Sequence, residues 1–220
     1  MKRFIVAIDQ GTTSSRAILF SLSGKPVCSS QKEFKQYFPK DGWVEHDPNE
    51  IWNTTKKVLI NIIKKSKKLK GKILTIGITN QRETTILWDE KTGKPVYNAI
   101  VWQDRRTAEF CKKFKKKIKE KIINKKTGLL VDPYFSGTKI KWILDNVPKA
   151  KKLAKNNQLL FGTVDTFLIW KLTKGKMHVT DATNASRTML FNISTNKWDK
   201  DILFNLRIPK NISRILQMYL

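Results

Sequence analysis

Residues 8–16 read "IDQGTTSSR" and follow the apolar run "FIVAI" at residues 4–8. One acid, one glycine, four hydroxyl side chains and one arginine occupy the positions after Ile8. The apolar run predicts a buried strand and "RAILFSLSG" predicts a second one, so we expect a β-hairpin. A plain turn needs only one or two such polar residues and does not explain four hydroxyls.

A phosphate-binding loop would explain this density of polar groups. Backbone N–H groups around Gly11 can form a concavity that binds anions, and threonine and serine hydroxyls add donors. Arg16 adds a charge that matches phosphate oxygens. Asp9, at the carboxyl end of its strand, can hold a hydrated Mg²⁺. A Walker loop is excluded, because G-x-x-x-x-G-K is absent and a strand follows where a helix should. A plain hairpin turn remains the alternative.

Composition indicates a globular, intracellular protein. The 220 residues are 40% hydrophobic, which suits one large domain or two small ones and excludes a disordered chain. No apolar run is long enough for a membrane span, and the N-terminus lacks a signal-peptide core. The two cysteines, Cys28 and Cys111, suit a reducing compartment and offer no metal spacing. We therefore expect a cytoplasmic protein with no zinc site, since His46 and His178 are isolated in sequence.

The net charge of +26 raises nucleic acid as a partner. Only 8 of the 44 basic residues are arginine, the side chain that reads bases and clamps phosphates best. In "FCKKFKKKIKEKII", residues 110–123, apolar residues recur every four positions and lysines fill the gaps. That pattern predicts a helix with one buried stripe and a solvated basic face. Specific nucleic-acid binding is therefore disfavoured.

Strands dominate the first third of the chain. Three strands joined by tight turns predict an antiparallel meander, and a helix then begins at "DPNE", with Asp47 as N-cap, Pro48 at the first helical position and Glu50 completing a capping box. The inward face of that helix is expected to carry Trp52, Val58, Leu59, Ile62 and Ile63. "KILTIGIT", residues 72–79, predicts a central strand in parallel pairing.

The remainder alternates strands and helices. We expect two strands around a turn within residues 84–102, helices at about 104–124 and 138–146, and a strand running into a helix at 159–173. "ASRTMLFNI", residues 185–193, predicts a strand, and "WDKDILFNL", residues 198–206, a short helix. These elements predict one α/β domain over residues 1–220, with no interior boundary.

Two further stretches make the assignment specific: "GITNQRETTILWD" at residues 77–89 and "NAIVWQDRR" at 98–106. They stand in order with "IDQGTTSSR", "GWVEHDP", "DPYFSGTKIKWIL" and "LLFGTVDTFLIWKLT". Together these six motifs, from about Phe4 to Pro209, closely resemble the N-terminal domain of the glycerol-phosphorylating branch of the FGGY carbohydrate-kinase family.

The resemblance implies an actin-like, ribonuclease-H-type fold, with a mixed sheet of three antiparallel meander strands plus parallel strands flanked by helices. It implies ATP-dependent phosphorylation of glycerol to sn-glycerol 3-phosphate, with ATP or ADP and Mg²⁺ as ligands. The nucleotide phosphates would be bound by Gly11, Thr12, Thr13, Ser14 and Arg16. Asp9 would assist Mg²⁺ through water. Glycerol would be bound by Arg82, Glu83, Trp102 and Tyr134.

These residue types suit a small triol, which needs paired donors and acceptors and an aromatic wall that excludes water. Taken alone, the pair Arg82-Glu83 would be read as a surface ion pair, and Trp102 and Tyr134 as core or interface residues. We also expect the four side chains to surround one pocket. Asp104 stands where the resemblance would have a small neutral residue; an ion pair with its neighbour Arg105 could absorb the charge, and an effect on the pocket rim stays open.

Part of the family pattern is missing from these residues. The resemblance implies that the catalytic base is the aspartate of a Gly-Asp-Gln motif, and that motif does not occur here. The second domain of the family is missing as well, and the pattern fades in "NISRILQMYL" after Pro209. We therefore expect a fragment, a truncation or a frameshifted product that is inactive alone. Two alternatives stay open: a non-catalytic remnant that binds polyol or phosphate weakly, and a basic nucleic-acid-binding module. A homo-oligomer of the full-length protein is also open.

Overall fold

The computed structural model describes residues 1–210 and 217–219. The chain forms two compact units. Unit 1 comprises Met1–Gln36 and Asp47–Gln81, and unit 2 comprises Tyr37–His46 and Arg82–Leu220. The closing segment "NISRILQMYL" falls largely outside the described residues. Within the described part of the chain, no helix combines the length and the apolar character that crossing a membrane requires.

Unit 1 is built on a four-stranded mixed sheet. Its strands are β1 (Lys2–Gln10), β2 (Ser14–Ser21), β3 (Pro26–Glu33) and β6 (Gly71–Asn80), in the order β3-β2-β1-β6. The first three pair antiparallel, and β6 lies parallel to β1. The predicted hairpin, the meander and the parallel pairing are therefore confirmed. Alternate residues of β1 point inward, so that Phe4, Val6 and Ile8 are buried.

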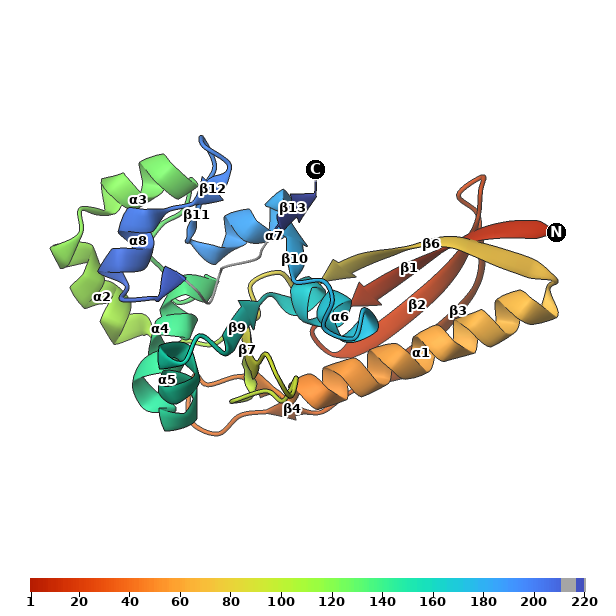
Figure 1. The fold of residues 1–220 in the computed structure, drawn as a ribbon, viewed down its shortest axis with the longest axis horizontal. Helices are drawn as coiled ribbons and strands as arrows, with labels where there is room; N and C mark the ends of the chain where they lie inside the picture. Colours follow the sequence, from red (N-terminus) through yellow and green to blue (C-terminus); the bar gives the residue numbers. More distant parts are fainter. Residues whose placement is uncertain (211–216, 220) are drawn as a thin grey trace. The chain divides into compact units, whose positions relative to one another are not determined.

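Helix α1 (Pro48–Lys68) packs across this sheet (Figure 1). The Asp47 side chain accepts a hydrogen bond from the Asn49 N–H at 2.8 Å, as expected of an N-cap. The capping box is not formed by Glu50, whose carboxylate accepts from the Lys35 N–H at 3.1 Å instead. The buried stripe is Ile51, Thr54, Thr55, Val58, Leu59, Ile62 and Ser66, so Trp52 and Ile63, expected inside, lie at its half-buried margins.

Strand β6 differs from expectation in its place in the sheet. Its apolar run predicts a central strand, but β6 is the edge strand next to β1 among the described residues. Leu74 and Ile76 are accordingly 47% and 39% exposed. An apolar run reports that a strand can be buried on both faces, and it carries no information on how many neighbours the strand has.

Unit 2 consists of short strands and eight-to-eleven-residue helices, with a few shorter turns of helix. Its strands are β5 (Glu45–His46), β7 (Ile86–Asp89), β8 (Ala99–Ile100), β9 (Leu159–Gly162), β10 (Val179–Asp181), β11 (Phe191–Asn192), β12 (Lys197–Trp198) and β13 (Gln217–Tyr219). Its helices are α2 (Ala108–Lys117), α3 (Glu120–Thr127), α4 (Ser136–Asn146), α5 (Pro148–Lys155), α6 (Val164–Leu172), α7 (Ala182–Ala185), a 3₁₀ helix (Ser186–Thr188) and α8 (Lys200–Asn205). β4 (Gln36–Tyr37) joins β5 and β8 in a small sheet, and β7 pairs antiparallel with β9.

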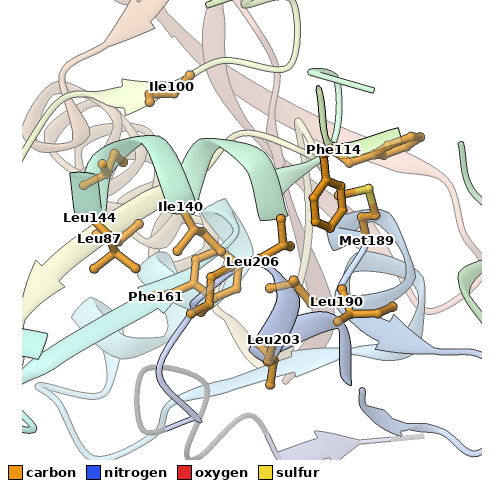
Figure 2. Packing of buried hydrophobic residues seen from close by; sticks show 14 of the residues in the cluster. Leu87, Ile100, Phe114, Ile140, Leu144, Phe161, Met189, Leu190, Leu203 and Leu206 are labelled. Carbon is orange, nitrogen blue, oxygen red and sulfur yellow. The ribbon is translucent and has the colours of Figure 1, made fainter. Parts of the chain in front are cut away.

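One hydrophobic core holds unit 2 together (Figure 2). Leu87 of β7 and Phe161 of β9 come from the paired strands, Ile140 comes from α4, and Leu203 comes from α8. These side chains are almost fully buried, and burying each contributes about 1.5–3 kcal/mol. The core therefore fixes the start of α4 against the strands, which matters for the site described below.

Two segments of unit 2 depart from the expected elements. The helix expected at 104–124 is divided at Ile118, whose backbone is extended, so Ile123 is buried and Ile122 is 46% exposed. The strand expected at 185–193 is reduced to Phe191–Asn192, because the chain before it is helical. That helical turn begins where the Asp181 side chain accepts from the Asn184 N–H at 2.7 Å.

Asp104 also behaves differently from expectation. It is buried and binds Arg106, with contacts of 2.9 Å from Nε and 2.8 Å from Nη2. The neighbouring Arg105 instead pairs with Asp132 at 3.0 Å, at the surface. Arg106 is fully buried and also contacts Glu45 at 2.7 Å. The expected pair between Asp104 and Arg105 is therefore wrong. The partner of the buried Asp104 is Arg106, because the Arg106 guanidinium is buried beside it and the Arg105 side chain lies at the surface.

Candidate functional site

The hairpin tip in unit 1 is the first candidate site. The Gly11 N–H donates to the Ser14 carbonyl at 2.9 Å, which closes the turn between β1 and β2, and the Phe34 N–H donates to the Thr13 carbonyl at 3.2 Å. Thr13 is exposed, while Thr12 and Ser14 are half-buried. These hydroxyls do not belong to an apolar core, which is what a phosphate loop requires.

Asp9 and Arg16 lie directly opposite each other in the antiparallel pairing of β1 and β2. Arg16 donates to Asp9 Oδ2 from Nη2 at 2.6 Å and from Nε at 3.2 Å. Their side chains are 46% and 36% exposed, so the pair stabilises the fold by at most about 1 kcal/mol. A bound phosphate would therefore compete with Asp9 for the guanidinium.

The side chains at the hairpin tip decide whether it could bind the expected Mg²⁺. Among residues 1–210 and 217–219, no group of three or more acidic, histidine or cysteine side chains could hold a metal ion. Mg²⁺ often keeps several waters and takes one or two carboxylates plus substrate phosphates. Asp9 alone fits such a water-mediated role, and it does not fit a dedicated protein cage.

The second candidate site lies in unit 2 and is centred on Glu83. This side chain is 2% exposed, and its Oε1 accepts a hydrogen bond from Arg187 Nε at 2.6 Å. The Arg187 guanidinium also lies 5.8 Å from the ring centre of Tyr134, and the Tyr134 ring lies 5.6 Å from that of Trp102. The structure thus brings Glu83, Tyr134 and Trp102 together through contacts in which Arg187 takes part.

Arg82 is the expected residue that the cluster does not include. Its side chain is exposed, and the hydrogen bonds of the described residues do not join it to the other three. Glu83 and Arg82 are adjacent in a turn before β7, where Glu83 is buried and Arg82 is exposed. A ligand or a rotamer change would be needed to bring Arg82 to the cluster.

Two residues of this site were missed by the sequence reasoning, Arg187 and Lys139. Arg187 lies in the segment that predicts a strand and is a 3₁₀ helix, so its direction could not be foreseen. Lys139 looked like one more surface lysine, yet its side chain is fully buried in α4. Its Nζ donates to the carbonyls of Glu83 at 3.1 Å and Tyr134 at 2.6 Å. Arginine is scarce in this chain, so each arginine could have been considered a candidate binding residue, which would have included Arg187. No such signal distinguishes Lys139 from the other lysines.

Burial dominates the electrostatics of Lys139. It lowers the pKa of the ammonium group from 10.5 to about 7, and the nearby carboxylates of Asp104, Glu83 and Asp132 oppose that shift. Arg106 adds to the lowering. The lysine is therefore held by two carbonyl oxygens, and the three carboxylates act on its charge without a direct contact among the described residues.

Tyr134 and Arg187 line a depression of about 420 Å³, which is bounded by residues of the segment 128–135. Arg82, Glu83 and Trp102, which were expected to surround the same pocket as Tyr134, are not among its lining residues. A larger depression of about 490 Å³ elsewhere in unit 2 is lined mainly by side chains of α4 and α5 and contains none of the expected residues. The smaller one has the size of a small-molecule site.

This arrangement can bind a neutral polyhydroxylated molecule. An ionised glutamate accepts hydrogen bonds from hydroxyl groups, and a guanidinium donates to their oxygens. Arg187 occupies one carboxylate oxygen of Glu83, and the hydrogen bonds among the described residues leave Oε2 for a further donor. The rings of Tyr134 and Trp102 provide an apolar surface for carbon atoms.

Comparison with known proteins identifies the family. The model for the N-terminal domain of the FGGY family of carbohydrate kinases matches residues 4–218. The glycerol kinase of Petrotoga mobilis is 60% identical over 212 residues, which are 96% of this chain and 43% of that enzyme. The glycerol kinase of Alkaliphilus metalliredigens is 61% identical, over 96% of this chain and 42% of its own length. The chain thus spans less than half the length of these curated relatives.

A solved structure agrees with these sequence matches. The crystal structure of Plasmodium falciparum glycerol kinase with ADP superposes with a TM-score of 0.90 at 39% identity, covering 99% of this chain and 43% of that one. The actin-like, ribonuclease-H-type domain and the mixed α/β architecture expected from the sequence are confirmed. Because the family model covers nearly all of its residues, this chain belongs to the FGGY family of carbohydrate kinases and corresponds to their N-terminal domain.

Proposed function

We propose that this chain is the N-terminal part of an enzyme that transfers a phosphoryl group from ATP to glycerol and produces sn-glycerol 3-phosphate. The observation that carries the proposal is the cluster of Glu83, Arg187, Tyr134 and Trp102, taken with identity near 60% to glycerol kinases. A triol with three carbons is small enough for one carboxylate, one guanidinium and two rings to recognise.

In this proposal each residue of unit 2 has one role. Glu83 accepts hydrogen bonds from glycerol hydroxyls through the oxygen that Arg187 leaves open. Arg187 holds that carboxylate in place, and Arg82 donates to the hydroxyl oxygens. Trp102 and Tyr134 cover the carbon atoms and exclude water, which strengthens every hydrogen bond within the site.

The hairpin tip of unit 1 supplies the phosphate contacts in this proposal. Thr12, Thr13 and Ser14 donate to the ATP phosphates beside Gly11, whose N–H closes the turn, and Arg16 leaves Asp9 to pair with the phosphates. Mg²⁺, when bound, neutralises charge that develops on the phosphates. Asp9 would contact the ion through water, and release from Arg16 would free its carboxylate for that role.

The general base is assigned outside these residues. Phosphoryl transfer requires a group that accepts the proton of the attacking hydroxyl, and such assistance is worth about 10²–10⁴-fold. The 220 residues contain no Gly-Asp-Gln segment, and Asp9 lies beside the phosphate loop, where it suits a metal ion. We therefore expect no appreciable turnover from the 220 residues alone.

A chimera tests the proposal directly. This chain is joined to the portion of the Petrotoga mobilis enzyme that lies beyond the matched region, and ADP release is measured with ATP, Mg²⁺ and glycerol. We expect activity in the chimera and none in the chain alone. Glu83→Gln should raise the glycerol KM by about tenfold or more and leave the ATP KM unchanged, because it removes one charged acceptor.

Glu109→Gln is the matched control, since Glu109 is an exposed carboxylate that pairs with Lys112 on the surface of α2. It should leave both constants unchanged. A chimera that unfolds cooperatively but phosphorylates a five- or six-carbon sugar in preference to glycerol would contradict the proposal. Equal effects of Glu83→Gln and Glu109→Gln would also contradict it.

A further inference from the structure

We propose that Lys139 is a positioning residue for polyol binding, because its ammonium group ties the backbone at Glu83 to the backbone at Tyr134. The two side chains meet the substrate from different segments, and their spacing decides whether both can contact one small molecule. The inference rests on the proposed function, since it concerns the same site.

The geometry places Lys139 between the two segments. Its Nζ donates to the Glu83 carbonyl at 3.1 Å and to the Tyr134 carbonyl at 2.6 Å. Glu83 precedes β7, and Tyr134 precedes α4, the helix that carries Lys139. One side chain therefore connects two segments that are far apart in sequence.

The carbonyl of Glu83 is held by more than one donor. Ser136 Oγ donates to it at 3.3 Å and Thr85 Oγ1 at 3.2 Å, in addition to Lys139. Thr85 holds the Glu83 backbone within its own segment, whereas Ser136, at the start of α4, joins it to the segment that follows Tyr134. Among the described residues, Lys139 is the one of these three donors that also bonds to the Tyr134 carbonyl, so it ties the backbones of the two substrate contacts to each other directly.

Stability alone does not explain a lysine at this place. Taking an ammonium group out of water costs several kcal/mol, and replacing buried charges with apolar side chains of similar volume is often neutral or stabilising. Burial of Lys139 is complete, and its lowered pKa reflects that cost. A methionine would fill the same space. What the lysine adds is a directional bond to two carbonyl oxygens.

The test uses the chimera described above. Lys139→Met should raise the glycerol KM by about tenfold or more, because a hydrogen bond to each of two backbone segments is lost. The ATP KM should stay within about twofold, and the thermal midpoint should stay close to that of the unmodified chimera. Lys139→Gln keeps an amide donor at the same place and should recover part of the glycerol affinity. Lys139→Gln also tests the inference if Lys139→Met does not fold.

Lys141→Met is the matched control, because Lys141 lies on the same helix and pairs with Asp145 outside the site. It removes one lysine charge from α4 and should leave the glycerol KM unchanged. A double variant with Glu83→Gln provides the second readout. If Lys139 acts through Glu83, the combined loss is smaller than the product of the two single losses.

The outcomes separate the two claims. An unmodified chimera that folds but does not phosphorylate glycerol overturns the proposed function, and this inference with it. An active chimera in which Lys139→Met leaves the glycerol KM unchanged overturns the inference alone. Equal increases in the glycerol and ATP constants, or losses that multiply fully with Glu83→Gln, overturn it too, because they indicate a general structural role.

Discussion

Replacement of Arg106 by methionine should be among the most destabilising single changes in unit 2. The Arg106 side chain is 0% exposed and bonds to two buried carboxylates, Asp104 and Glu45, at 2.8 and 2.7 Å. Its guanidinium lies 3.8 Å from the ring centre of Trp43 and 4.6 Å from that of Trp142. Burial alone would lower the pKa of Arg106, but the hydrogen bonds to the two carboxylates outweigh it and raise the pKa.

The magnitude follows from what the substitution leaves behind. Arg106→Met leaves Glu45 at 2% and Asp104 at 1% exposure without the cation between them. Breaking a buried pair by removing one partner costs about 3–5 kcal/mol, a large share of the roughly 5–15 kcal/mol that stabilises a domain. Arg105→Met is the matched control. Arg105 is 55% exposed and pairs with Asp132 at the surface, so its loss should cost at most about 1 kcal/mol.

Urea unfolding followed by tryptophan fluorescence measures both variants. In Arg106→Met the two carboxylates have raised folded-state pKa values, because a buried carboxylate without a cation favours its neutral form. A group whose folded pKa is raised loses its contribution to stability as the pH rises through that pKa. The penalty should therefore be larger at pH 7 than at pH 5, and adding Asp104→Asn should recover part of it.

The reasoning is refuted if Arg106→Met and Arg105→Met lose the same free energy of unfolding at pH 7. It is also refuted if the penalty of Arg106→Met does not shrink at pH 5. Either result would mean that water or local rearrangement solvates the two carboxylates. The ion pairs of Arg106 with Asp104 and Glu45 would then behave as surface pairs and not as buried ones.

Three further outcomes are expected. Burial lowers the pKa of His178 to about 4, so folding stability is lost as the pH falls from 6.5 towards 4. In urea titrations at acid pH, His178→Gln should reduce that loss by at most about 3 kcal/mol. An unchanged slope of stability against pH would contradict this. Gly71→Ala should destabilise unit 1 by about 1–3 kcal/mol in chemical denaturation, because a Cβ there would lie 2.1 Å from the Phe4 ring; a neutral effect would show that the ring moves freely. Burial raises the pKa of the Cys111 thiol to about 11, so a thiol reagent at pH 8 should label Cys28 in the folded chain and Cys111 only on unfolding, and equal rates would contradict this.

The features that the sequence predicted correctly are those decided by neighbours along the chain. The hairpin at Gly11 follows from turn residues between two apolar runs, and the start of α1 follows from Asp47 and Pro48. The strand-to-helix passage from β9 to α6 is equally local. In each case a few adjacent residues carry the whole signal.

Features decided by contacts between distant residues could not be predicted in the same way. The edge position of β6 depends on which strands are available to pair, and the break at Ile118 shifts the phase of the apolar repeat by one residue. Lys139 resembles the other lysines until the core places α4 against β7 and β9. Arg187 reaches Glu83 only because its segment is a 3₁₀ helix.

The overall charge of the chain and the pairing of its individual charged residues point to different kinds of partner. The chain carries its net charge of +26 mainly on lysines, which alone would suggest a polyanion partner. One arginine at each candidate site is engaged with an acid: Arg16 with Asp9, and Arg187 with Glu83. Pairing of this kind orients a carboxylate, which the proposed recognition of a small neutral polyol requires and an electrostatic attraction for nucleic acid does not. The chemistry of the chain is therefore better read from a few paired arginines than from its many lysines.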